Sequence, residues 1–305
     1  MRVKHLLALI LLALIWGLNF PAMKMGSHYL PPLLFAAGRF FLGALFLFPL
    51  AVIRQGRIWH TKRDFGPLLV YGILQTVFMG GGLHLGISLI KSSITSIVLY
   101  TYPFFFTFFA YLLLREPLTG KQIAGLIIGF AGLIVVVHPW NIAIGEVNYT
   151  GILILLLASI GWGLASVYLK AVLKTYDQLI VTTYQMFYGS LILFIVGAVT
   201  EPWRQVSWTL PCLGIMLYTA LIASALGFYI LLTVQVRYPA SQTSVFLFLV
   251  PVFGVLFSSL FLKEELTINV ILGLILVAAG IIVVSLGSLQ QEQTQYKLEN
   301  KIKPG

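Results

Sequence analysis

Charged side chains are scarce in this sequence. They make up 9% of its 305 residues, whereas hydrophobic residues make up 59%, and the mean hydropathy is +0.98. A soluble globular domain carries about 25% charged residues. So few charges cannot cover the surface of a globule of this size, and the composition therefore predicts a protein whose natural solvent is lipid.

Cysteine is almost absent. The single Cys212 excludes an intrachain disulfide and argues against a metal site built on cysteine. We predict no metal and no cofactor, and we interpret Cys212 as a small apolar residue near the start of a helix. The first apolar run, from Leu6, is longer than the core of a cleaved signal peptide, so we expect it to remain as a helix.

Several catalytic motifs are also missing. The sequence contains no Gly-x-Ser-Gly with a paired histidine, no His-Glu-x-x-His and no Walker A motif. Their absence argues against an intramembrane enzyme and against ATP hydrolysis, so we predict that the chain is not an enzyme. No Asp or Glu lies within an expected membrane span, and the lack of such a carboxylate favours facilitated diffusion or exchange over proton coupling.

Long apolar runs dominate what is present. A helix needs about 20 predominantly apolar residues to cross a bilayer, and ten segments meet this need, which predicts an all-α integral membrane protein. The segments are Leu6–Gly26, Pro32–Ile53, Pro67–Ile90, Ser92–Leu114, Lys121–His138, Gly151–Val172, Gln178–Val199, Pro211–Gln235, Pro239–Leu262 and Asn269–Gly287. The chain beyond them is polar, and we predict that 289–305 form a disordered cytoplasmic tail.

Lysine and arginine are distributed unevenly between the two ends of these segments. With the N-terminus inside, 14 of the 19 fall on the cytoplasmic side, 4 fall outside, and Arg39 lies within a helix. Cytoplasmic loops of membrane proteins carry such an excess. The bias predicts a multi-pass protein of the cell membrane with both termini in the cytoplasm, and it explains the net charge of +10 without a nucleic-acid partner.

The two halves of the sequence resemble each other. Leu12–Lys24 reads LALIWGLNFPAMK and Ala158–Lys170 reads ASIGWGLASVYLK, so Trp, Gly, Leu and Lys recur at an offset of 146 residues. Each half holds five expected helices, an odd number, so the second half must be inserted upside down. The pattern predicts two inverted repeats, residues 1–143 and 144–288, and inverted repeats are the architecture of many secondary transporters.

One set of residues near the N-terminus forms a recognisable pattern, namely Trp16–Phe20, Lys24, Leu30–Phe35, Arg39 and Phe40. It resembles the first two helices of EamA-type proteins, which belong to the drug/metabolite transporter superfamily. The turns Arg115–Thr119 and Lys263–Thr267, each followed by a glycine-rich helix, fit the same family. The second half departs from the pattern of the first, with Ala165 in place of Asn19 and Gln185 in place of Arg39.

The resemblance implies a ten-helix carrier with a central cavity for metabolites or amino-acid-like solutes. We therefore predict a secondary transporter that moves a small amphipathic metabolite by alternating access, with export as the expected direction. Its expected partners are this small-molecule substrate and the lipid bilayer. A channel-like facilitator, a receptor and an intramembrane enzyme are the alternatives, and a homodimer is left open.

Two residues, one arginine and one histidine, lie well inside the expected spans. Arg39 lies in the second helix, where an arginine is costly and usually faces the bundle interior or water. It is either an anchor for a substrate carboxylate or phosphate or a structural arginine tied to backbone carbonyls. His84 lies in the third helix, where it either carries a coupling proton or packs as a hydrogen-bonded neutral side chain.

Polar and aromatic residues at helical spacing suggest a cavity wall. Trp16 and Asn19 share one face of the first helix, and the alternative for them is packing between helices. The proposed lining is Trp16, Asn19, Arg39, Gln75, His84, Tyr100, Tyr102, Thr107, Trp162, Ser166 and Gln185. Kinks or hinges are expected at prolines, which remove a backbone donor, and these are Pro21, Pro103 and Pro251.

Glycine is concentrated in the expected fifth and tenth helices. The residues concerned are Gly125, Gly129, Gly132, Gly273 and Gly280, in sequence that is otherwise nearly uniformly aliphatic. Small residues allow helices to approach closely within a membrane. We interpret these two helices as scaffold or as an oligomer contact, and not as part of the substrate wall.

Overall fold

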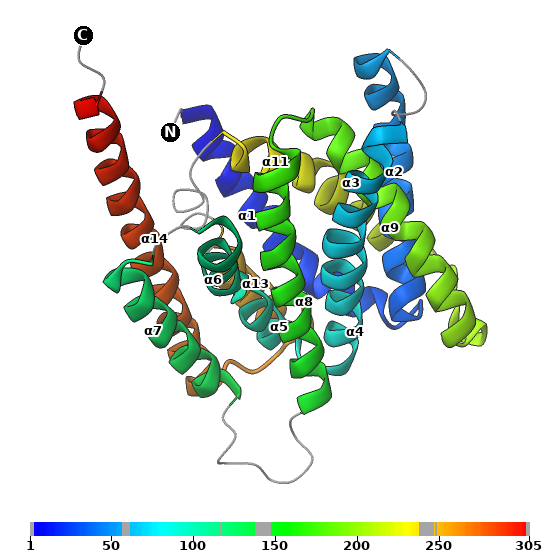
Figure 1. Cartoon of the computed structure of the whole chain (residues 1–305). Coiled ribbons are helices and arrows are strands. Elements are labelled where there is room, and N and C mark those ends of the chain that lie inside the picture. The colour runs from blue at the N-terminus through cyan, green and yellow to red at the C-terminus, as the bar shows by residue number, and fades with distance from the viewer. Residues whose placement is uncertain are drawn as a thin grey trace.

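A computed structural model describes residues 3–56, 62–115, 118–137, 148–237, 247 and 249–302 (Figure 1). Within these ranges every regular element is a helix. The elements are α1 (Val3–Gly26), α2 (Pro32–Gln55), α3 (Lys62–Gly72), η1 (Ile73–Gly81), α4 (Gly82–Leu89), α5 (Ser92–Leu99), α6 (Tyr102–Leu114), α7 (Gly120–Val137), α8 (Tyr149–Tyr168), η2 (Leu169–Leu173), α9 (Gln178–Thr200), η3 (Trp203–Gln205), α10 (Leu210–Leu217), η4 (Tyr218–Leu226), α11 (Gly227–Gln235), α13 (Leu249–Leu262) and α14 (Ile268–Ile302).

The number of apolar helices confirms a multi-pass membrane protein. Seven of the described helices are long and apolar enough to cross a bilayer. Three shorter apolar helices, Gly120–Val136, Leu249–Leu262 and Ile268–Val284, lie at the expected fifth, ninth and tenth spans. The start of α1 and the end of α14 lie at the same end of the bundle (Figure 1).

The last helix differs from the expectation of a disordered tail after residue 288. α14 continues to Ile302, so residues 289–302 are helical, while 303–305 lie outside the described residues. The polarity of this segment alone predicts disorder. Its Gln, Glu, Lys and Leu residues have high helix propensity, and they extend a helix that is already nucleated by the apolar part of α14.

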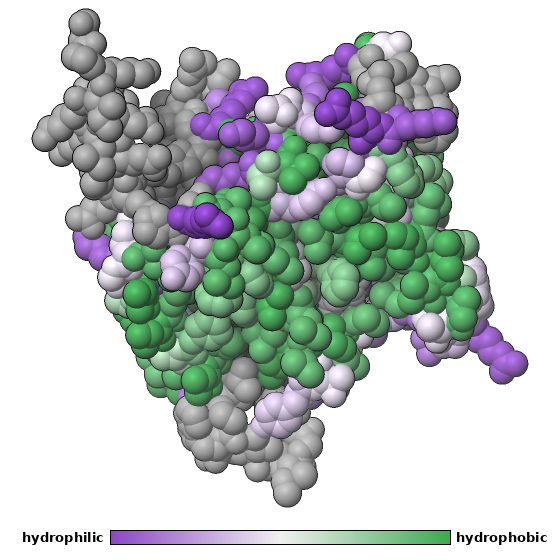
Figure 2. Space-filling view, viewed as in Figure 1, coloured by the Kyte–Doolittle hydropathy of each residue, from purple (hydrophilic) through white to green (hydrophobic). Residues whose placement is uncertain are grey.

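The outward surface of the bundle is largely apolar. Figure 2 shows a broad band of hydrophobic side chains on one face, with hydrophilic side chains gathered above it. On α2 the side chains of Leu45, Phe46 and Ile53 are 58%, 55% and 78% exposed. Exposed apolar surface costs about 25 cal/mol per Å² in water, so this band is suited to lipid tails.

The repeat seen in the sequence is matched by local structure. The helix that contains η1 and the helix that contains η4 each change to π-helical hydrogen bonding over nine residues, at an offset of 145. Arg115 and Lys263, which were paired by the sequence repeat, both adopt left-handed backbone angles, with φ of 56° and 54°. Corresponding positions in the two halves therefore share unusual backbone geometry.

The two halves also make corresponding contacts with each other. A Cβ added at Gly17 of α1 would lie 2.4 Å from the Cβ of Phe253 in α13. A Cβ added at the matching Gly163 of α8 would lie 2.9 Å from the Cβ of Phe105 in α6. The first helix of each half therefore packs closely on the fourth helix of the other half.

The glycine-rich helices pack against one another within the chain. α7 and α14 lie side by side at one side of the bundle (Figure 1). A Cβ added at Gly280 would lie 2.6 Å from the backbone N of Gly129 and 2.7 Å from the backbone O of Gly125. The scaffold interpretation is therefore the one that the packing supports, because these faces are covered by the same chain.

The expected hinges lie at different kinds of position. Pro21 lies inside α1, which runs on as a helix to Gly26. The fourth expected span is broken at Tyr100 and Thr101, so α5 and α6 are separate helices, and Pro103 is the second residue of α6. Pro251 lies close to the first residue of α13. Cys212 is buried near the start of α10, as expected for a small apolar residue.

Side chains from two elements hold the short turn between α4 and α5. Lys24, near the end of α1, donates from Nζ to three carbonyl oxygens of residues 87, 88 and 90, at 2.8, 3.3 and 2.9 Å. These carbonyls have no partner within the helix that ends there, and a cation is stabilised near them by the helix dipole. The end of α1 is thereby fixed to the end of α4.

Glu264 holds the other side of this turn, and its replacement provides a stability test. Its carboxylate accepts from the backbone N–H groups of Ser92 and Ser93, at 2.8 and 3.0 Å, and from the Ser93 hydroxyl at 2.5 Å. We expect Glu264→Gln to lower the free energy of unfolding by about 1–2 kcal/mol, because a neutral amide accepts less strongly at a helix N-terminus.

The measurement is thermal or denaturant unfolding of the purified protein in detergent. Glu265→Gln is the matched control, since Glu265 is the next residue and is exposed. We expect this control to change stability by less than about 0.5 kcal/mol. Equal effects of the two variants would show that Glu264 does not stabilise the start of α5.

Candidate functional site

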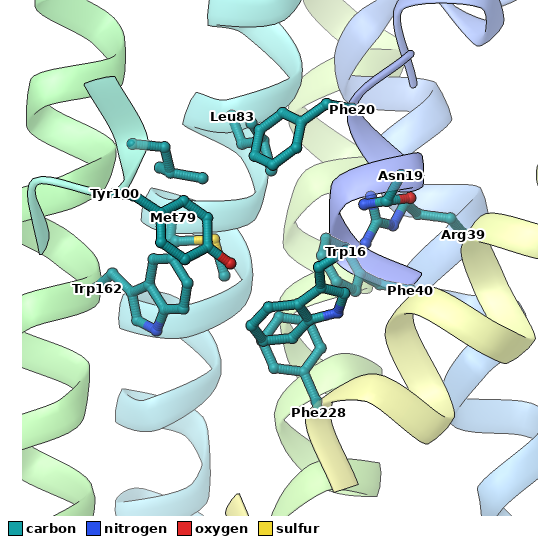
Figure 3. Close-up of a pocket in the computed structure, with 11 residues that line it drawn as sticks. Trp16, Asn19, Phe20, Arg39, Phe40, Met79, Leu83, Tyr100, Trp162 and Phe228 are labelled. Carbon is teal, nitrogen blue, oxygen red and sulfur yellow. The ribbon is translucent and has the colours of Figure 1, made fainter. Parts of the chain in front are cut away.

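A cavity lies in the interior of the bundle, where helices of both halves meet (Figure 3). It receives side chains from α1, α2, η1, α4, α5, the α5–α6 turn, α8 and α11. The lining residues are Trp16, Asn19, Phe20, Arg39, Phe40, Met79, Leu83, Leu99, Tyr100, Trp162 and Phe228. Its volume is about 30 Å³, which is room for about two water molecules. The site is therefore narrow in this conformation.

Aromatic rings form one side of the cavity. Tyr100 and Trp162 lie together on that side in Figure 3, with ring centroids 5.4 Å apart. Trp16 contacts both Trp162, at 5.9 Å, and Phe228, at 5.2 Å. The rings meet at steep angles, an arrangement that aromatic pairs favour and that stabilises each pair by about 0.5–1.5 kcal/mol beyond burial.

The position of Trp16 depends on a helix of the other half. Its Nε1 donates a hydrogen bond of 2.8 Å to the carbonyl oxygen of Ala223 in η4. A Cβ added at Gly227 would lie 2.5 Å from the same Nε1 atom, so only glycine admits the indole at this place. Trp16 therefore joins the first half of the chain to the eighth expected span.

Among the described residues that line the cavity, Arg39 is the one with a cationic group. Its side chain is 2% exposed. Nε donates to Oγ of Ser224 in η4 at 2.9 Å, and Nη1 donates to Sδ of Met23 at 2.8 Å. The guanidinium carbon also lies 4.7 Å from the centre of the Phe40 ring, a cation–π distance. Arg39 is thus oriented by contacts from α1, α2 and η4.

The charge of Arg39 has no counter-charge among the residues that the structure describes. The ion pair found among the described residues joins Arg54 to Asp177 at 2.5 Å, at the end of α2, and no described carboxylate contacts Arg39. Burial of an ion without a partner costs several kcal/mol even after relaxation. An anion that entered the cavity would remove part of this cost.

His84 contacts Arg39 but does not line the cavity. Its Nε2 lies 3.2 Å from Nη1 of Arg39, and the imidazole edge meets the Phe35 ring at a centroid distance of 4.8 Å. A guanidinium N–H only donates, so Nε2 must accept, and the proton of a neutral ring lies on Nδ1. The geometry therefore favours the packing interpretation of His84 over the coupling-proton interpretation.

Asn19 lines the cavity and has a buried acceptor atom without a partner among the described residues. The side chain is 5% exposed, and its Oδ1 has no hydrogen-bond partner among the described residues. Its Nδ2 contacts Sδ of Met23 at 3.5 Å. In Figure 3 the amide of Asn19 and the guanidinium of Arg39 lie on one side of the cavity, and Tyr100 and Trp162 lie on the other. The cavity thus has a polar wall and an aromatic wall.

Five of the predicted residues line the cavity, and six lie elsewhere. The five are Trp16, Asn19, Arg39, Tyr100 and Trp162. Of the others, His84 contacts Arg39, and Tyr102 stacks on Trp162 with ring centroids 3.9 Å apart. Thr107 donates to the carbonyl oxygen of Pro103 within its own helix. Ser166 is buried in α8 away from the cavity lining.

Gln75 and Gln185 lie in a separate buried region. Nε2 of Gln75 and both amide atoms of Gln185 are buried without a partner among the described residues. Thr76 donates to the backbone oxygen of Gln185 at 3.1 Å, so η1 and α9 are in direct contact there. Neither glutamine lines the cavity, although Gln185 stands where Arg39 stands in the other half.

Sequence reasoning missed six lining residues, namely Phe20, Phe40, Met79, Leu83, Leu99 and Phe228. All are apolar, and in a membrane protein an apolar residue on a helix face is as compatible with lipid as with a cavity. Ser224, which orients Arg39, was missed as well. The pairing of Trp16 with Trp162 was the one signal for an aromatic contact between the halves.

Comparison with known proteins finds relatives both by sequence and by fold. The chain is 31% identical over 279 residues to the uncharacterized transporter YoaV of Bacillus subtilis (strain 168), covering 92% of this chain and 96% of the relative. It is 28% identical over 286 residues to a probable amino-acid metabolite efflux pump of Escherichia coli (strain K12), covering 89% and 91%. A solved crystal structure aligns with a TM-score of 0.71 at 17% identity, covering 96% of this chain and 100% of that chain, which shows a shared fold.

The family assignment rests on a match that includes both halves. The sequence pattern of the EamA-like transporter family is found twice, over residues 3–138 and 149–286. These two ranges cover most of the chain, and they contain all the residues that line the cavity. This chain belongs to the EamA-like transporter family.

Proposed function

We propose that this protein is a secondary transporter that exports a small amphipathic metabolite by alternating access. The observation that carries the proposal is the central cavity, which both halves line and which contains a buried, uncompensated Arg39 opposite an aromatic wall. A substrate with an anionic group and an apolar body would complement both walls. The export direction is supported by the name of the Escherichia coli relative, a probable amino-acid metabolite efflux pump.

The proposed architecture is ten spans in two inverted halves, residues 1–143 and 144–288. The three shorter apolar helices supply the spans beyond the seven long ones. Matching backbone geometry at Arg115 and Lys263 supports equivalent halves. The common end of α1 and α14 in Figure 1 supports an even number of spans with both termini in the cytoplasm of a cell-membrane protein.

Two equivalent halves offer a physical route to alternating access. If the halves exchange conformations, inward-open and outward-open states have similar energies. The cavity of about 30 Å³ is too small for a metabolite, so a substrate needs the surrounding helices to separate on one side. We propose exchange or facilitated diffusion as the mode, since no carboxylate lines the cavity among the described residues.

The test is counterflow in liposomes that contain the purified protein. A panel of amino acids and other organic acids is supplied outside, with and without the same unlabelled solute inside. Stimulation by internal solute is expected for at least one member, because an alternating-access carrier returns faster when loaded. Rapid flux without stimulation would indicate a channel, and absence of flux for every solute by folded protein would contradict the carrier proposal.

A further inference from the structure

We propose that Glu201 and Glu264 hold the two halves of the chain together at the end of the bundle opposite the termini, the distal end, and that both must be released for substrate to pass on that side. The inference rests on the proposed alternating access, and it names the contacts that one step of the cycle must break. In the proposed topology the distal end faces the outside of the cell.

Glu201 joins the end of α9 to the start of α2. It directly follows α9, and its Oε1 and Oε2 accept from the backbone N–H groups of Leu33 and Leu34, at 2.8 and 2.9 Å. The first N–H groups of a helix have no partner within that helix. Pro31, which precedes α2, carries no side-chain acceptor. A carboxylate of the second half therefore satisfies two donors of the first half.

Glu264 makes the same arrangement between α13 and α5. It follows the end of α13, and its Oε1 and Oε2 accept from the backbone N–H groups of Ser92 and Ser93, at 2.8 and 3.0 Å. The side chain of Lys91, which precedes α5, only donates, so it does not cap this helix. The hydroxyl of Ser258 in α13 also donates to the hydroxyl of Ser92 at 2.9 Å.

Both capped helix starts lie at the distal end. The α1–α2 and α4–α5 turns and the ends of α9 and α13 all lie away from the two termini (Figure 1). Each contact joins a helix of the first half to a helix of the second half, and the paired helices pack side by side, α2 with α9 and α5 with α13. The halves therefore cannot separate at the distal end unless both contacts break.

Both capped helices also lead to the cavity wall. In α2 the lining residue Arg39 follows Leu34 by five residues. In α5 the lining residue Leu99 follows Ser93 by six residues. At about 1.5 Å per residue, the capped starts are about 8 and 9 Å from these lining residues along the helix axes. Movement of the helix starts away from α9 and α13 would therefore separate the cavity walls on this side.

The chemistry of these contacts allows them to break and form again. Hydrogen bonds from N–H groups to a carboxylate are stronger than those between neutral groups, and the positive end of the helix dipole adds to them. Glu201 and Glu264 are each only partly buried. Water can therefore solvate the carboxylates and the released N–H groups when the halves separate. The contacts stabilise one state without trapping the protein in it.

Different contacts join the halves at the end nearer the termini. Arg54 at the end of α2 pairs with Asp177, which directly precedes α9. The hydroxyl of Tyr176 donates to Oδ1 of Asp64 at 3.1 Å. α2 and α9 are thus joined at both of their ends. The side chain of Arg54 is 54% exposed, and replacing it should loosen only the end nearer the termini.

The experiment measures distances across both ends by electron paramagnetic resonance on the purified full-length protein in detergent. The first label pair, His28→Cys with Arg204→Cys, joins exposed positions of the two halves at the distal end. The second label pair, Lys62→Cys with Lys174→Cys, does the same at the other end. Both pairs are made in a Cys212→Ser background, because Cys212 is the one cysteine of the sequence.

The decisive variants are Glu201→Gln, Glu264→Gln and the double variant. Glutamine has one acceptor oxygen and presents an NH₂ group to the second backbone N–H, so each replacement removes a charged hydrogen bond. We expect the ratio of long to short distances in the first label pair to rise about tenfold in each single variant and about a hundredfold in the double variant. The second label pair should keep its wild-type distances.

Glu264→Gln is the sharper of the two single variants. Its contact joins α5 to α13, whereas the first label pair reports on the turn before α2 and the turn after α9. Local fraying beside a label cannot lengthen the distance in this case. A merely structural role of Glu264 would lower the melting temperature without changing the distance at one end, so the melting temperature is measured on every variant. The single variants carry the test if the double variant does not fold.

Glu265→Gln and Arg54→Gln are the controls. Glu265 is exposed and adjoins Glu264, so its replacement should keep the wild-type distances in both label pairs. Arg54→Gln should lengthen the distance in the second label pair alone, because it removes the ion pair with Asp177. The two sets of variants are therefore expected to act at opposite ends of the bundle.

Four results would overturn the inference. They are wild-type distances in both single variants, lengthening in Glu201→Gln alone, equal lengthening at both ends, and the same lengthening in Glu265→Gln. The measurement uses no substrate, so each of these results leaves the transporter proposal intact when counterflow is observed in liposomes. Absence of counterflow for every solute is the separate result that removes the transporter proposal itself.

Discussion

Replacing Arg39 with methionine should reduce transport of carboxylate substrates by about two orders of magnitude, measured as initial counterflow rates in liposomes. A hydrogen bond to a charged group contributes about 1.5–3 kcal/mol, and Arg39 offers both charge and a fork of donors. Arg39→Lys should be intermediate, because it keeps the charge but loses the fork that also bonds Ser224 and Met23.

The same replacement should leave the fold intact. An apolar side chain in place of an unpaired buried charge is often neutral or stabilising, so the melting temperature of Arg39→Met in detergent should equal or exceed that of the wild type. Gln185→Met is the matched control at the corresponding position of the second half, outside the cavity. Wild-type rates for Arg39→Met, or an equal loss for Gln185→Met, would refute the anion-anchor role.

Replacing Gly280 with alanine should destabilise the protein by about 1–3 kcal/mol, because overpacking of a close contact forces the backbone to shift. The added Cβ would lie 2.6 Å from the backbone N of Gly129 and 2.7 Å from the backbone O of Gly125. Neither of these atoms belongs to a flexible side chain that could move aside. The expected readout is a melting temperature in detergent lowered by several degrees.

Gly214→Ala is the control for this prediction. A Cβ at Gly214, inside α10, would meet no atom within 4 Å. Alanine has a higher helix propensity than glycine by about 1 kcal/mol, so this variant should melt at or above the wild-type temperature. A Gly280→Ala protein as stable as the Gly214→Ala protein would show that α7 and α14 are free to separate.

Much of the fold follows from patterns that the sequence displays directly. The apolar runs between Leu6 and Gly287 correspond to the observed helices to within a few residues at most ends, because a membrane span is defined by length and hydropathy alone. The family was recognisable from Trp16–Phe20 and the turn residues. The tail was the exception, since helix propensity prevailed over polarity up to Ile302.

The candidate site was predictable only in part. Arg39 stood out because a charge within a span is costly, and Trp16 with Trp162 stood out because the repeat pairs them. Phe228 and Ser224 carried no comparable signal. Their places depend on how η4 and α11 pack against α1 and α2, and the periodicity of a single helix does not contain this long-range information.

Because two helices contain the π-helical segments η1 and η4, the number of residues in these helices determines which side chains face the cavity. Each residue advances an α-helix by about 100°. A π-helical turn holds one residue more than an α-helical turn, so it changes the direction in which every later side chain points about the helix axis. Within η4, the hydroxyl of Ser224 bonds the carbonyl oxygen of Thr219, five residues earlier, and also receives Arg39. Deletion of one residue there would leave a helix but rotate Phe228 away from the cavity. Relatives could therefore change which side chains line the cavity by insertions and deletions in these two helices, and not by substitutions alone.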